Sequence, residues 1–208
     1  MGVWTHLASW LVQSGEVPQL EVGDTFRQVA LRAACWSVTN ASGPEGVGEL
    51  SGPDPSGDRS FHYAITGVAE WSREPSSVLL RAGRLAFLAE PREVHAMPDA
   101  VHLSAERHTA GFRVPAVGER VSVVAGLQVM AAYEIEAFDF PDVRCDWRVR
   151  GLKVEHRELV ASPEFPDTRE PGRVLQVDDI PRMLRWADAS GRDHATYLLD
   201  LEPSPETD

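Results

Sequence analysis

Hydrophobic and polar residues alternate along much of this chain, a pattern typical of β-strands that bury one face. The alternation is clearest over residues 61–71, where Phe61, Tyr63 and Ile65 fall on one face. Weaker versions predict further strands over residues 25–36, 78–88, 111–115, 119–138, 145–159, 172–177 and 195–201. We therefore expect an all-β protein with a minor helical content.

The strand pattern also contains irregularities. Two breaks in alternation predict a bulge or register change near residues 26–29 and a second bulge near Gly151. Residues 1–13 fit a helix or a first strand equally well, and residues 180–186 predict one or two helical turns. Residues 40–60 are rich in Gly, Pro, Ser and Asp, which predicts a long loop.

Three short landmarks occur twice, in the same order. The first set is Val22-Gly23-Asp24, Ile65-Thr66-Gly67-Val68 and Gly83-Arg84-Leu85, and the second is Val117-Gly118-Glu119, Val149-Arg150-Gly151-Leu152 and Gly172-Arg173-Val174. Recurrence at this period favours a tandem duplication. We expect two small antiparallel β-barrels or curled sheets, over 1–115 (with an N-terminal extension) and 116–203, related by a pseudo-twofold axis. Residues 204–208 form an acidic tail.

The V-G-D opening, the central strand with its glycine and the closing Tyr197-Leu198-Leu199-Asp200-Leu201 resemble a family of small uncharacterised bacterial domains of unknown function. The resemblance covers residues 117–202 best, and in residues 1–115 the segment Gly111-Phe112-Arg113-Val114 stands in place of the closing motif. The resemblance implies a fold and no activity.

Charge changes the expected partners. The 208 residues include 32 acidic and 20 basic side chains, for a net charge of −12. A negative field repels phosphate backbones and anionic membranes and speeds association with basic proteins. Nucleic acid is therefore an unfavourable partner, although Arg144, Arg148 and Arg150 could form a local basic patch. No membrane association is expected, because no apolar run is long enough to span a bilayer.

The two cysteines, Cys35 and Cys145, are too isolated for a disulfide framework or a zinc site. Each lies next to a tryptophan in an apolar stretch, so we interpret both as buried thiols. Free thiols and the lack of a signal-peptide pattern favour the cytoplasm.

One segment carries metal-ligand residue types. His95, His102 and His108 lie close together with Glu106, and imidazoles and carboxylates together can bind zinc or another divalent cation. Their spacings match no standard metal motif, so solvated histidines in a loop are the alternative. No phosphate-binding loop, dinucleotide fingerprint or nucleophile elbow is present, and we expect no cofactor.

Three aromatic residues are candidate binding residues. Trp71 and Trp147 lie in corresponding strands of the two expected copies, and Tyr63 is the positional match of Trp147. Exposed tryptophans anchor many protein interfaces, whereas buried ones pack in the core. Both uses remain open at the level of sequence.

These features favour a non-enzymatic cytoplasmic binding or adaptor protein that recognises another protein, with a basic partner as for an immunity or inhibitor protein. The alternative is a metal-dependent or small-molecule-binding enzyme that uses the histidine and carboxylate segment 93–108.

Overall fold

The computed structural model describes residues 2–50, 61–73, 77–91, 112–137, 142–161, 169–184 and 193–204. Most of them lie in β-strands, so the predicted all-β class is confirmed. The chain forms two compact units. Unit 1 joins Met1–Gln28 to Cys145–Asp208, and unit 2 comprises Val29–Gly52 and Ser60–Arg144.

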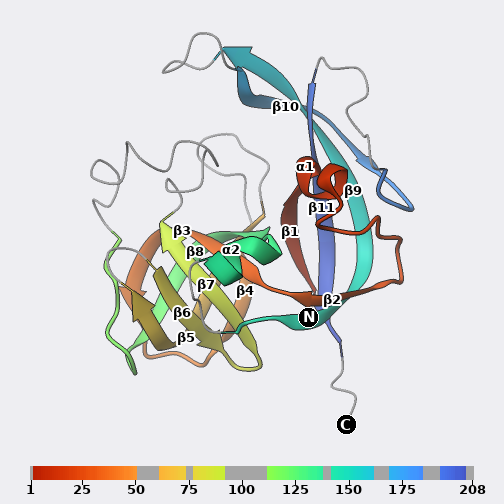
Figure 1. Ribbon diagram of the computed structural model, residues 1–208. Coiled ribbons are helices and arrows are strands. Elements are labelled where there is room, and N and C mark those ends of the chain that lie inside the picture. Colours follow the sequence, from red (N-terminus) through yellow and green to blue (C-terminus); the bar gives the residue numbers. More distant parts are fainter. Residues whose placement is uncertain are drawn as a thin grey trace. The chain divides into compact units, whose positions relative to one another are not determined.

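Unit 2 contains a closed five-stranded barrel (Figure 1). Its strands are β3 (Leu31–Asn40), β5 (His62–Arg73), β6 (Ser77–Ala82), β7 (Leu85–Pro91) and β8 (Arg120–Val129). Around the barrel, β3 pairs with β8, β8 with β5, β5 with β6, β6 with β7, and β7 with β3. Only the β7–β3 pair is parallel. A sixth strand, β4 (Gly46–Leu50), pairs with the first half of β5.

The period-2 pattern of the sequence explains the barrel. Alternate residues of β5 such as Tyr63 and Ile65 are fully buried, as are Leu31 of β3 and Phe87 of β7. Burial of side chains this large stabilises a fold by roughly 1.5–3 kcal/mol each. Aliphatic side chains of β6, β7 and β8 face a narrow space inside the barrel that is lined almost wholly by apolar groups.

A short helix, α2 (Ala132–Ala137), follows β8 and packs on a second apolar cluster. Ile135 of α2 contacts this cluster beside Leu79 of β6 and Leu88 of β7, with Trp71 partly buried against it. Leu79 and Leu88 are paired across β6 and β7. Each lies one position from residues that face the barrel interior, so the cluster covers the outer wall of the barrel.

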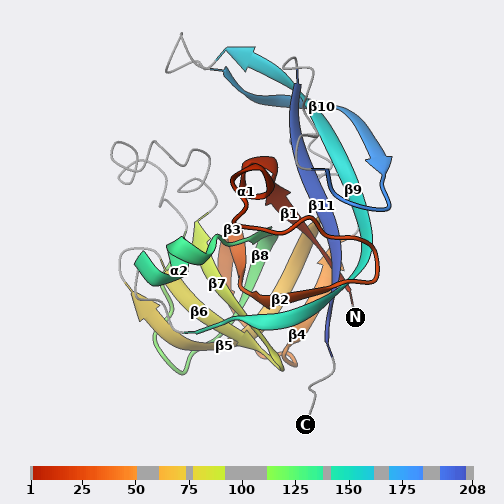
Figure 2. The ribbon, with the colours of Figure 1, turned by 45° about the vertical axis from the view of Figure 1, so that its right-hand side comes forward.

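Unit 1 is an antiparallel sheet in the strand order β10-β9-β11-β1 (Figure 2). Its strands are β1 (Val3–Ala8), β9 (Cys145–Ala161), β10 (Arg169–Asp179) and β11 (Asp193–Pro203), and β2 (Thr25–Val29) also pairs with β9. The helix α1 (Ser9–Ser14) directly follows β1 and ends at Gly15, whose φ is 85°. The first segment of the chain is therefore strand and then helix.

Both predicted irregularities are present. The β11–β9 register shifts between Asp200 and Leu201, next to Gly151, so the predicted bulge is confirmed. The long strand predicted over 25–36 is divided between β2 and β3, and Gln28 at the break has a φ of 53°. Four other predictions are wrong. The loop 40–60 contains β4, and described residues 180–184 form no helix; instead Arg182 bridges Glu21. Described residues 112–115 form no strand, and the strand expected over 119–138 ends at Val129 and gives way to α2.

One landmark adopts the same structure twice. In residues 21–24, the Asp24 backbone N–H donates to the Glu21 carbonyl, and the Asp24 carboxylate accepts from the Glu21 N–H. In residues 116–119, Glu119 and Ala116 make the same two hydrogen bonds. The glycine of each turn has a positive φ, 102° at Gly23 and 88° at Gly118, where a side chain would be strained. The motif V-G-D/E is therefore a turn with its own carboxylate cap.

The other landmarks do not correspond. The first turn pairs with Val149, two residues before Gly151, whereas the second pairs with Ala69, two residues after Gly67. The matched glycines therefore occupy different positions relative to the turns. The first turn also lies in unit 1 together with β9, although the expected copies would place the turn in the first copy and β9 in the second.

Tandem duplication is consequently not shown. Gly83 lies in the turn between β6 and β7, whereas Gly172 lies within β10, so the third landmark differs as well. The units also differ in extent from the expected copies 1–115 and 116–203, because β8, expected to open the second copy, closes the barrel of unit 2.

Candidate functional site

The sequence-predicted metal residues cannot be placed. His95, His102, His108 and Glu106 lie outside the described residues. Within the parts of the chain that are described, no group of three or more His, Cys, Asp or Glu side chains is arranged to hold a metal ion.

The three aromatic candidates occupy packing positions. Tyr63 and Trp147 are each 1% exposed and belong to the largest fully buried side chains. Trp71 is partly buried against the cluster beneath α2. Since Tyr63 and Trp147 present almost no ring surface to solvent, both act in the core of their own unit.

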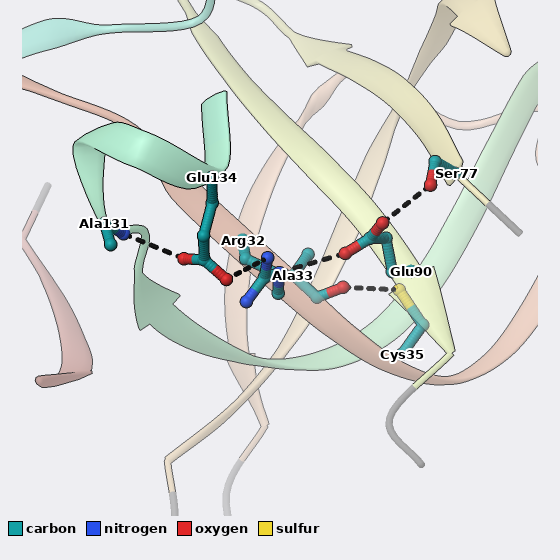
Figure 3. A network of polar contacts seen from close by, with 7 residues as sticks. All are labelled: Arg32, Ala33, Cys35, Ser77, Glu90, Ala131 and Glu134. Carbon is teal, nitrogen blue, oxygen red and sulfur yellow. Dashed lines mark hydrogen bonds and ion pairs between the residues drawn. The ribbon is translucent and has the colours of Figure 1, made fainter. Parts of the chain in front are cut away.

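The most organised polar site among the described residues lies on the outer wall of the barrel (Figure 3). Arg32 of β3 donates from Nε to Glu90 Oε2 at 2.9 Å and from Nη2 to Glu134 Oε1 at 3.0 Å. Ser77 of β6 donates its hydroxyl to Glu90 Oε1 at 2.6 Å. Arg32, Ser77 and Glu90 are buried, and Glu134 is half-buried. One guanidinium therefore joins two strands and a helix.

The strand register explains this arrangement. Glu90 pairs with Ala34 across the parallel β7–β3 ladder, which brings its carboxylate two positions from Arg32 on the same face. Glu134 also accepts the Ala131 N–H at 2.9 Å, so one carboxylate caps α2 and binds the arginine. A charged hydrogen bond is worth about 1.5–3 kcal/mol, and a buried arginine without partners would be very costly. The network thus fixes α2 on the barrel.

The thiol beside the network is unreactive at neutral pH. Cys35 donates its S–H to the Ala33 carbonyl, at 3.2 Å. Burial raises the pKa of the Cys35 thiol to about 12. Burial likewise raises the pKa of half-buried Cys145 to about 11. Since the thiolate is the nucleophile, neither cysteine is activated for catalysis.

The basic side chains of the described surface are largely paired with carboxylates. Ion pairs of 4.0 Å or less involve Arg32, Arg81, Arg113, Arg120, Arg144, Arg150, Lys153, Arg157, Arg173 and Arg182. Two of the three arginines of the expected basic patch are in this set. Hydrogen bonds from the Arg144 guanidinium also hold the pKa of Asp142 below its usual range.

The buried network was not predicted from the sequence. Its ion pairs join residues 58 and 102 positions apart, which no local pattern connects. The available signal was Arg32 itself, a charged residue inside an otherwise apolar stretch, because such a residue needs a buried partner.

Comparison with known proteins adds no relative. No family model matches this chain, and neither the curated proteins nor the solved structures contain a match. Among the described residues, no helix has both the length and the apolar character needed to cross a membrane.

Proposed function

We propose that this chain is a non-enzymatic cytoplasmic binding protein that recognises a basic region of another protein, in the manner of an immunity or inhibitor protein. The proposal rests on how the charged side chains are paired. The described cations are largely held by neighbouring carboxylates, while the chain as a whole has 12 more acidic than basic residues. Among the described residues, several exposed carboxylates lie outside these ion pairs and are available to an external cation.

Several of these carboxylates face solvent. Glu16 and Glu49 are exposed and form no ion pair within the described residues, and Glu136 is exposed while its charge acts on Arg144. A surface of this kind attracts a basic protein over roughly a Debye length, about 8 Å at physiological ionic strength. The expected signature is fast association that slows as salt is added.

The test is affinity capture from extract of the native cell with the full-length chain, followed by kinetics with the captured protein. We expect one stoichiometric basic protein whose association rate falls steeply with ionic strength. The double variant Glu16→Lys/Glu136→Lys should slow association several-fold, whereas Glu16→Asp/Glu136→Asp keeps the charge and should not. Capture of no protein, or of one whose association ignores salt, would contradict the proposal.

A further inference from the structure

Strand β4 has one free edge. Gly46–Leu50 pair with His62–Thr66 of β5 in five consecutive positions, without a register shift. In an antiparallel strand, alternate N–H and C=O groups point away from the partner. Within the described part of the chain, no further strand or backbone hydrogen bond reaches the other side of β4. This side, the β4 edge, is a template for another strand.

Among the described residues, neither conformation nor close packing requires the two glycines of β4. Neither Gly46 nor Gly48 has a positive φ. An added Cβ would meet nothing within 4 Å at Gly46, and only the Ala64 carbonyl oxygen at 3.9 Å at Gly48. Glycine in a strand costs roughly 0.5–1 kcal/mol relative to alanine, so the fold alone disfavours both. Glycine in a strand often marks the close approach of another backbone.

Strand β10, a second edge strand of this chain, has features that protect an edge from pairing with another chain. Within the described residues, strand β10 pairs with β9 alone, and its ladder is interrupted by two register shifts, near Pro171 and Val174. Arg173 is also exposed on it. Bulges, proline and charged side chains are among the devices that prevent an edge from pairing with another chain. Strand β4 has neither a bulge nor a proline, and its one charged residue is Glu49.

The charge on β4 selects the occupant. Glu49 is exposed and unpaired among the described residues, and Leu50 is 41% exposed. A second copy would place Glu49 opposite Glu49 in parallel pairing, or opposite Val47 in antiparallel pairing about Gly48. Five residues also bury far less than the roughly 1,200 Å² of a stable dimer. An extended segment with basic side chains would instead place a cation opposite Glu49.

We propose that the β4 edge is the docking site for an extended, basic segment of a partner protein, which adds as a strand beside Gly46–Leu50. Main-chain hydrogen bonds supply affinity, and Glu49 favours lysine or arginine on the added strand. The inference rests on the proposed function, because it takes the partner to be basic, and it adds where and how that partner binds.

The probe is a labelled, acetylated seven-residue peptide that alternates valine with lysine and arginine, added to the full-length chain. Fluorescence anisotropy measures its binding, and amide hydrogen exchange locates it. We expect slower exchange over 46–50. Gly48→Pro should weaken binding at least tenfold, because proline on an edge strand prevents that edge from pairing with another chain. Gly43→Pro, at another glycine with open space around it, is the matched control and should bind as the wild type.

Two further reagents test the mechanism. A peptide N-methylated at alternate residues should not bind, because it cannot complete the ladder. Glu49→Lys should lose binding with no change in melting temperature, which keeps the test valid if Gly48→Pro fails to fold. Absence of peptide binding, or binding with protection elsewhere and no effect of either β4 variant, would overturn the inference. So would a dimer that Gly48→Pro dissociates, since a second copy would then occupy the edge. If the captured native partner still binds a folded Gly48→Pro normally, the docking site is wrong while the proposed function stands.

Discussion

At the scale of single residues, the distance from a side chain to the nearest atoms around it determines which substitutions each unit tolerates. Gly67 of β5 is the tightest case, because a Cβ there would lie 2.2 Å from the Arg81 carbonyl oxygen of β6. That oxygen belongs to the backbone of the neighbouring strand and cannot rotate away. Glycine at this position is required by close approach and not by φ.

Gly67→Ala should therefore lower the free energy of unfolding by about 3 kcal/mol, the upper range for overpacking, because β5 and β6 must separate. The measurement is urea denaturation. Gly46→Ala is the matched control in the neighbouring strand, where a Cβ touches nothing, and should be neutral or stabilising by about 0.5 kcal/mol. Equal effects at the two glycines would show that the β5–β6 contact is not limiting.

Thr5 of β1 presents the opposite problem. Its side chain is fully buried, and its Oγ1 has no hydrogen-bond partner. Valine has nearly the same shape without the hydroxyl, so Thr5→Val should stabilise the protein by about 1 kcal/mol, the lower range for an unmet buried polar group. Thermal and urea unfolding measure the gain. Thr196→Val, at a half-buried threonine of β11, should change stability little, and destabilisation by Thr5→Val would contradict this account.

At the scale of elements, the Arg32 network determines how α2 is held. The helix has only six residues, too few to be stable alone, and it relies on Ile135 and Glu134 for its attachment. The first contact is apolar and the second is a charged hydrogen bond. Losing either should free the helix from the barrel wall.

Arg32→Met should cost about 3–5 kcal/mol, the usual cost of breaking a buried ion pair, because Glu90 and Glu134 lose their cation. Arg81→Met removes an equally short but exposed pair with Glu70 and should cost less than about 1 kcal/mol. Denaturant unfolding of both variants measures these losses in the free energy of unfolding. If the two variants lose similar stability, burial of the network does not set its strength.

The alternation of hydrophobic and polar residues predicted the strands that bury one face. The remaining elements and the buried network depend on contacts distant in sequence, which no local pattern shows. Tyr63 and Ile65 marked β5 because strand geometry places alternate residues on one face. Strand β4 was hidden by its glycines, and α2 by its length. The landmark V-G-D/E forms the same carboxylate-capped turn at both of its places in the chain, and local chemistry explains that turn, so its recurrence alone does not show a duplication.

At the scale of the whole molecule, the two units differ in how the chain builds them. Unit 2 comes from Val29–Gly52 and Ser60–Arg144, both in the central part of the chain, whereas unit 1 needs both Met1–Gln28 and Cys145–Asp208. All pairings that close the barrel lie within the central stretch. A closed barrel leaves no unpaired edge among its own five strands.

A fragment of residues 29–144 should therefore fold by itself. We expect a β-type circular dichroism spectrum, a single cooperative thermal transition and dispersed amide resonances. The fragment 145–208 is the matched control, because it lacks β1 and β2, and it should remain largely unfolded. A non-cooperative 29–144 fragment would show that the barrel depends on the rest of the chain.

The pairing of β1 with β11 joins Val3 to Leu201. During synthesis, β1 leaves the ribosome almost two hundred residues before its partner strand exists. At about 5–20 residues per second, this delay is on the order of ten to forty seconds. The barrel can close within that interval, while the apolar residues of β1 and α1 remain without their final partners. The N-terminal segment thus keeps apolar surface exposed on the nascent chain, and the speed of translation between β1 and β11 sets how long it waits.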